Sequence, residues 1–189
     1  DCPFHKHEYA DVCKNLFNAF RDKGLGIAAY FSKPDWHSPY YWAKGMEKGK
    51  KRDRNPTYDV KEYPWLWNNF VEYTHRQMME LVSHYGEIDI LWLDGGQVRP
   101  ENGQDIKMEQ IIKKARQKQP GLLAVDRTVG GRYENYITPE QKVPSTPLRV
   151  PWESCITMGT SFSFQYEDDY KSKRELLQLL IDIICKGGN

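Results

Sequence analysis

The sequence predicts an α/β protein built as a (β/α)8 barrel like that of triosephosphate isomerase. Helical and strand-type apolar patterns alternate along the chain, which is typical of parallel strands with helices packed outside them. The longest and most aromatic loops follow predicted strand ends, where a barrel places its active site. No G-x-G-x-x-G motif follows a strand, which disfavours a doubly wound nucleotide-binding sheet. A complete barrel needs roughly 250 residues, so we expect an incomplete one of about four βα units.

The first predicted elements are a helix and a strand. Residues 8–23 place apolar side chains at helical spacing, and Gly24 follows as a stop signal. Residues 25–32 form a short apolar run that suits a strand buried on both faces. Residues 33–63 are irregular and rich in Pro, Trp, Tyr and charge, and loops of that length are usually functional.

The same alternation continues through the middle of the chain. Residues 64–85 carry a helical apolar stripe that Gly86 ends, and residues 88–94 form the next strand. A third helix is predicted over 105–118, followed by a strand over 122–126.

A second irregular loop separates these elements from the last two. We expect a strand over 150–157 and an amphipathic helix over 171–186. Cys13 and Cys185 lie in helical patterns and are predicted to be small buried apolar groups.

Composition argues against several classes of partner. The net charge of +1 gives no excess that would attract nucleic acid or an anionic membrane surface, and no apolar run is long enough to span a membrane. The four cysteines form no C-x-x-C pair, so we expect no zinc site. The six Trp and twelve Tyr suit sugar binding as well as core packing.

Asp94 is the strongest candidate for a catalytic residue. Strand side chains alternate, so Trp92 and Asp94 share one face, which points inward in a barrel. Asp94 then lies at the carboxyl end of its strand, where barrel enzymes bind substrate. Gly95 and Gly96 remove side-chain bulk beside the carboxylate. The alternative is an Asp that only caps the turn after the strand.

A glycosidase needs a second carboxyl group that is protonated at rest, and Glu153 is the first choice. It follows Trp152 in a predicted strand, and partial burial beside an indole raises a carboxyl pKa. A surface Glu at a strand start is the alternative interpretation. Glu134 and Glu140 are competing candidates for the same role. In a retaining pair the two carboxyl groups lie about 5–5.5 Å apart.

Trp92 and three further residues are candidates for substrate binding. Arg127 ends a strand, where it could bond sugar hydroxyls or orient the nucleophile. Tyr30 ends the first strand, and Trp36 lies in the loop just beyond it. Each of these residues could equally be structural.

A set of short motifs resembles glycoside hydrolase family 29, the α-L-fucosidases. In order along the chain they are Tyr30-Phe31-Ser32 with Asp35-Trp36, Leu91-Trp92-Leu93-Asp94-Gly95, Asp126-Arg127, and Trp152-Glu153 with Gly159. Each motif alone is weak, but the combination is specific and covers nearly the whole chain.

The resemblance implies retaining hydrolysis of terminal α-L-fucose from a glycan by a barrel domain, usually followed by a β-sandwich. It implies Asp94 as nucleophile, Glu153 as acid/base, and substrate contacts from Tyr30 and Arg127, with no metal or organic cofactor. Secretion or a periplasmic location is suggested by the resemblance alone.

The resemblance also has a departure. Relatives carry a His-His-Asp-Gly segment and a further His on earlier strands, and both are missing here. We therefore expect residues 1–189 to be the central portion of one catalytic domain, inactive by itself. The alternative class is a non-catalytic carbohydrate-binding module or a degenerate barrel.

Overall fold

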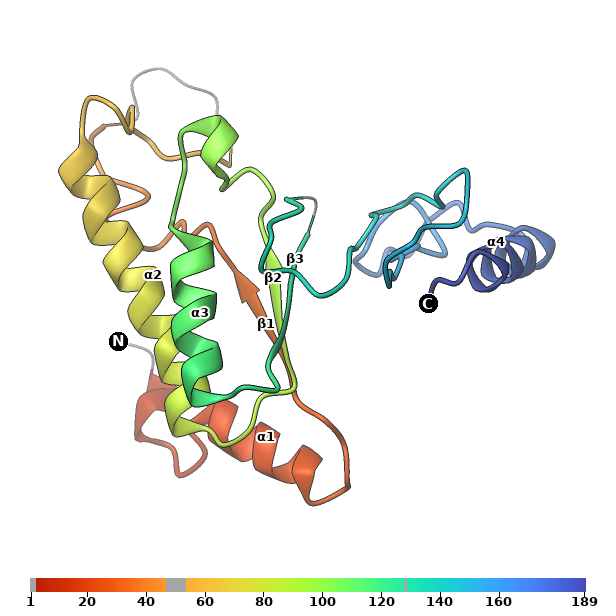
Figure 1. Cartoon of the computed structure of the whole chain (residues 1–189), viewed down its shortest axis with the longest axis horizontal. Helices are drawn as coiled ribbons and strands as arrows, with labels where there is room; N and C mark the ends of the chain where they lie inside the picture. Colours follow the sequence, from red (N-terminus) through yellow and green to blue (C-terminus); the bar gives the residue numbers. More distant parts are fainter. Residues whose placement is uncertain (1–2, 47–53, 128) are drawn as a thin grey trace.

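The computed structural model describes residues 3–46, 54–127 and 129–189 (Figure 1). Residues 47–53 of the predicted first loop lie outside the described residues. The elements, in chain order, are η1 (Pro3–Lys6), α1 (Val12–Arg21), β1 (Ala28–Ser32), α2 (Pro64–His84), β2 (Ile90–Asp94), η2 (Pro100–Asn102), α3 (Met108–Lys118), β3 (Leu123–Asp126) and α4 (Lys173–Cys185).

The three strands form one parallel sheet in the order β1-β2-β3. Its register aligns Ser32 with Asp94 and Leu93 with Asp126, so the carboxyl ends of all three strands meet at one edge. Parallel pairing follows from the helical crossovers α2 and α3 that connect the strands. The predicted α/β class with parallel strands is confirmed for this sheet.

Helices cover one face of the sheet. Figure 1 shows α2 and α3 side by side on this face, and their apolar side chains pack against alternate strand residues. Leu91 and Leu93 are fully buried there, whereas Trp92 and Asp94 point to the opposite face and are only partly buried. The alternation predicted for residues 88–94 is therefore confirmed, and the face that carries Asp94 is free of helices.

The predicted helix over 105–118 begins three residues late, at Met108. Lys107 takes a left-handed backbone conformation with φ of 57°, which a continuous α-helix does not permit. The Asp105 carboxylate accepts the backbone N–H of Lys107 at 2.7 Å and stabilises this turn.

The predicted strand over 150–157 is wrong. This segment makes only isolated bridges, which pair Trp152 with Ile137 and with Gly188, and Cys155 with Glu140. Its neighbour is an irregular segment instead of β3, and Pro151 has no N–H to donate, so no continuous ladder forms. The described residues thus hold a sheet of three strands where about four were expected.

The amino- and carboxyl-terminal helices expose apolar side chains. In α4 the exposed residues are Leu177, Leu180, Ile181 and Ile184, and in α1 they are Val12, Leu16 and Phe20. Cys13 and Cys185 are also exposed, so their predicted burial is wrong. The cause is that none of the described residues packs over these helix faces; Figure 1 shows α4 extended away from the sheet. No helix of the described part of the chain is long and apolar enough to cross a membrane.

Candidate active site

Asp94 ends β2 on the face of the sheet without helices. One carboxylate oxygen, Oδ2, accepts a short hydrogen bond from the Tyr30 hydroxyl, and Oδ1 accepts the backbone N–H of Gly95 at 2.7 Å. The Asp94 side chain is 25% exposed, so it remains accessible to a ligand. Two uncharged donors thus hold the carboxylate at the edge where the strands end.

Tyr30 and Trp92 form an aromatic surface beside this carboxylate. They face each other across the β1–β2 pair, and their rings stack with centroids 5.5 Å apart. Burial, together with the contact to Asp94, raises the pKa of Tyr30 to about 12. The phenol therefore stays protonated at neutral pH and continues to donate to Asp94.

Arg127 is the residue directly after β3, and like Tyr30 it contacts the Trp92 ring. Its guanidinium carbon is 4.7 Å from the centre of the Trp92 ring, in cation–π geometry. Its Nε is 3.6 Å from Asp94 Oδ1, and its other arm pairs with Glu140 Oε1 at 2.9 Å. Arg127 is thus shared between two carboxylates, and its side chain is only 15% exposed.

Glu153 reaches this cluster from the long loop after β3. Its Oε1 accepts the indole N–H of Trp92 at 2.7 Å. Tyr136 also hydrogen-bonds Glu153, and burial with this contact raises the pKa of Tyr136 to about 12. Trp92 therefore lies between Asp94 on its own strand and Glu153 from a remote segment.

Two of the sequence candidates lie apart from this cluster. Glu134 accepts the backbone N–H of Asp126 at 2.6 Å, and burial raises the pKa of its carboxyl group. Its Oε1 is therefore occupied by a hydrogen bond from the backbone of β3. Trp36 is half exposed on the loop after β1, and its indole N–H donates to the Arg54 carbonyl at 3.5 Å.

A buried ion pair that the sequence did not predict lies at the same strand ends. Lys33 Nζ lies 2.5 Å from Asp126 Oδ1, and both side chains are wholly buried. Tyr133 donates to the other Asp126 oxygen at 2.6 Å. Burial lowers the pKa of Lys33 and raises that of Asp126, while the attraction between the two opposes both shifts. A lysine directly after a strand gives no sequence signal of burial, because lysines are almost always exposed.

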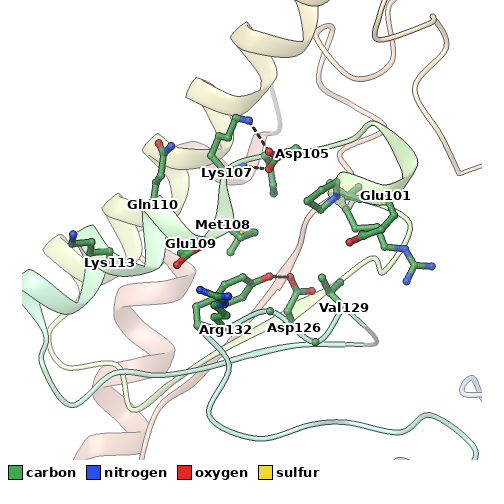
Figure 2. Close-up of a pocket in the computed structure, with 17 residues that line it drawn as sticks. Glu101, Asp105, Lys107, Met108, Glu109, Gln110, Lys113, Asp126, Val129 and Arg132 are labelled. Carbon is green, nitrogen blue, oxygen red and sulfur yellow. Dashed lines mark hydrogen bonds and ion pairs between the residues drawn. The ribbon is translucent and has the colours of Figure 1, made fainter.

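One cavity lies away from the Asp94 cluster. It has a volume of about 620 Å³ and lies between η2, the start of α3 and residues 129–133 (Figure 2). Asp126, bonded to Tyr133, forms part of its wall, on the helix-covered face of the sheet. The Asp94 cluster does not line this cavity.

Within the described ranges, no group of three or more His, Cys, Asp or Glu side chains is arranged to hold a metal ion. The chemical groups at the strand ends are instead carboxylates, aromatic rings and one arginine. Carboxylates at the carboxyl ends of parallel βα strands, with aromatic rings beside them, are the arrangement of a glycoside hydrolase.

Comparison with known proteins identifies the family. The family described as alpha-L-fucosidase matches residues 4–189. An α-L-fucosidase of Dictyostelium discoideum is 25% identical over 201 aligned residues, covering 95% of this chain and 38% of that protein. The chain therefore belongs to the α-L-fucosidase family, and the predicted resemblance is confirmed.

Solved structures of α-L-fucosidases share the fold of this chain. α-L-Fucosidase isoenzyme 1 from Paenibacillus thiaminolyticus superposes with a TM-score of 0.69 and 26% identity, covering 95% of this chain and 45% of that one. A family 29 α-L-fucosidase from Bacteroides thetaiotaomicron, solved as a trapped covalent intermediate with 2-fluoro-fucosyl fluoride, shares the fold with a TM-score of 0.68 at 20% identity. The superposition covers 98% of this chain and 45% of the Bacteroides protein. The chain thus spans less than half of each of these relatives.

Proposed function

We propose that the protein containing this chain is a retaining glycosidase that releases terminal α-L-fucose from glycans. The observation that supports this most is that Asp94 and Glu153 both contact the Tyr30–Trp92–Arg127 group on one face of the sheet. Membership of the α-L-fucosidase family supports α-L-fucose as the sugar that is released. We favour a catalytic role for both carboxylates over a binding module, because a glycosidase needs two acidic groups near one sugar and sugar binding alone does not.

Asp94 is the proposed nucleophile. It attacks the anomeric carbon, the glycosidic C–O bond breaks, and the departing oxygen takes a proton from Glu153. Water, deprotonated by the same glutamate, then displaces Asp94 and releases fucose with its original configuration. Tyr30 holds the carboxylate by its hydroxyl, and Arg127 balances its charge. The trapped intermediate of the Bacteroides relative is consistent with such a covalent step.

Glu153 is the preferred acid/base among the three candidate glutamates. Glu153 bonds to two uncharged side chains, Trp92 and Tyr136, and Trp92 lies on the face of the sheet that carries Asp94. Glu140 pairs instead with the Arg127 guanidinium at 2.9 Å, which suits it to hold Arg127 in place. Glu134 accepts the backbone N–H of Asp126 with its Oε1, so this oxygen is already used within β3.

Trp36 is proposed to contact the substrate from the loop after β1. Its half-exposed ring is on the strand-end side of the sheet, where it can pack on the apolar face of a sugar. Arg127 and Trp92 are proposed to contact the fucose ring itself.

The remainder of the catalytic domain is the proposed partner of the apolar helix faces, with a β-sandwich expected after it. We expect residues 1–189, purified alone, to release no measurable product from an aryl α-L-fucoside, because the other barrel strands would complete the sugar pocket. The measurement is a continuous assay of the released phenol, with the full-length protein as control. Robust turnover by the piece would overturn this expectation.

The stereochemistry of the reaction tests the proposed function. We expect the full-length protein to hydrolyse an aryl α-L-fucoside and to release α-L-fucose first, with the β anomer appearing later by mutarotation. Proton NMR during the first minutes of the reaction distinguishes the two anomers. Initial release of β-L-fucose would rule out the double displacement, and the absence of any hydrolysis would favour a binding module.

A further inference from the structure

The carboxyl ends of β1, β2 and β3 are joined by Lys33, the residue directly after β1. Its backbone N–H donates to the Asp94 carbonyl at 3.0 Å. Its side chain passes to the helix-covered face, where Nζ donates to the Val98 carbonyl at 3.0 Å and pairs with Asp126 at 2.5 Å. One buried residue thus contacts the end of β2, the turn after it, and the end of β3.

The turn after Asp94 depends on the same segment. Gly95 has a φ of 88°, which side chains other than glycine rarely adopt. The Pro34 ring packs against the Gly95 Cα so closely that a Cβ at position 95 would collide with it. Gly95 also donates the backbone N–H that Asp94 Oδ1 accepts. Lys33 and Pro34 therefore support the backbone of Asp94 from the face opposite to its carboxylate.

Asp126 connects the same contacts to Arg127. Arg127 follows it in sequence, and its backbone N–H donates to the Leu93 carbonyl at 3.0 Å. A displacement of the end of β3 would move Arg127 relative to Asp94, which its Nε approaches to 3.6 Å. Tyr133 holds the second Asp126 oxygen, so Asp126 is fixed from both sides.

We propose that Lys33 is a positioning residue for the nucleophile, and that its buried amino group fixes the end of β2, with Asp94, relative to the end of β3, with Arg127. This inference rests on the proposed function, because it assigns Lys33 a role in the reaction of Asp94. The Lys33 side chain lies on the helix-covered face and acts through the strand ends, to which the attraction between its ammonium group and the Asp94 carboxylate adds.

The test separates positioning from stability in the full-length protein. The probe is 2-fluoro-α-L-fucosyl fluoride, and the readout is its rate of covalent attachment to Asp94, followed by intact mass and peptide mapping. Lys33→Met removes the amino group and leaves Asp126 buried without its partner, so both the Tm and the labelling rate fall, the rate by roughly 10²-fold. In Lys33→Met/Asp126→Asn no charge is left unpaired, so the Tm recovers. The labelling rate stays low, because the strand ends are still not joined.

Lys107→Met is the matched control, since Lys107 forms an exposed pair with Asp105 at 2.6 Å. It is expected to label at the wild-type rate. If Lys33→Met and Lys33→Met/Asp126→Asn both fail to fold, Asp126→Asn is compared with the wild-type protein. It keeps the Lys33 amino group and an acceptor oxygen, so we expect labelling within about fivefold of wild type.

Three outcomes overturn the proposal: wild-type labelling of Lys33→Met, recovery of labelling together with the Tm in the double variant, or loss of labelling in Asp126→Asn as large as that in Lys33→Met. The proposed function fails separately, if the wild-type protein is not labelled on Asp94.

Discussion

Replacing Asp94 with Ala in the full-length protein is expected to lower kcat for an aryl α-L-fucoside by roughly 10⁴-fold or more, because the covalent step loses its nucleophile. The short bond from Tyr30 and the bond from Gly95 both end on this carboxylate, so no neighbouring group can replace it. Added azide should restore part of the rate, because a small anion fits the space left by the side chain. A single displacement by azide inverts the anomeric centre, so the product should be β-L-fucosyl azide.

Asp105→Ala is the matched control for this variant. Asp105 is a partly exposed carboxylate paired with Lys107, outside the Asp94 cluster. Its loss removes a bond that stabilises the turn before α3, so we expect a lower Tm and activity within about twofold of wild type. The measurement is steady-state release of phenol, with NMR of the azide product. Wild-type kcat in Asp94→Ala would remove the nucleophile assignment. If the product were α-L-fucosyl azide, the role of nucleophile would belong to another carboxylate.

The second large effect is expected from Glu153→Ala. The general acid matters most when the leaving group is a sugar, so kcat/KM on a fucosylated oligosaccharide should fall by about 10²–10⁴-fold. With a dinitrophenyl α-L-fucoside, whose leaving group needs no proton, kcat/KM should stay within about tenfold of wild type. Azide attacks here after the covalent intermediate has formed. Two displacements then give α-L-fucosyl azide, the opposite anomer to the Asp94 variant.

Glu140→Ala separates the two glutamates that share this face. Glu140 pairs with Arg127, whereas Glu153 bonds to Trp92, so the losses should have different patterns. For Glu140→Ala we expect an equal loss on both substrates, caused by movement of Arg127. A loss that depends on the leaving group in this variant, and not in Glu153→Ala, would transfer the acid/base role to Glu140.

Local patterns predicted the three strands and four helices well, but not every boundary or partner. The apolar run over 122–126 became β3, because it follows the α3 crossover and finds β2 as a continuous parallel neighbour. The run over 150–157 looked similar and did not become a strand, because strand formation needs a continuous neighbour and its neighbour is irregular. Periodicity cannot report what lies beside a segment.

By itself, the sequence determined that helices and parallel strands alternate and that Trp92 and Asp94 lie on one face at the end of β2. These properties follow from side-chain periodicity along a single element, which is local. Only the tertiary structure decided that Glu153 meets Trp92 and Tyr136, that Arg127 is shared by Asp94 and Glu140, and that Lys33 is buried against Asp126. Those contacts join residues from separate strands and loops, and the free energy that selects them depends on burial and charge pairing, which no single segment contains.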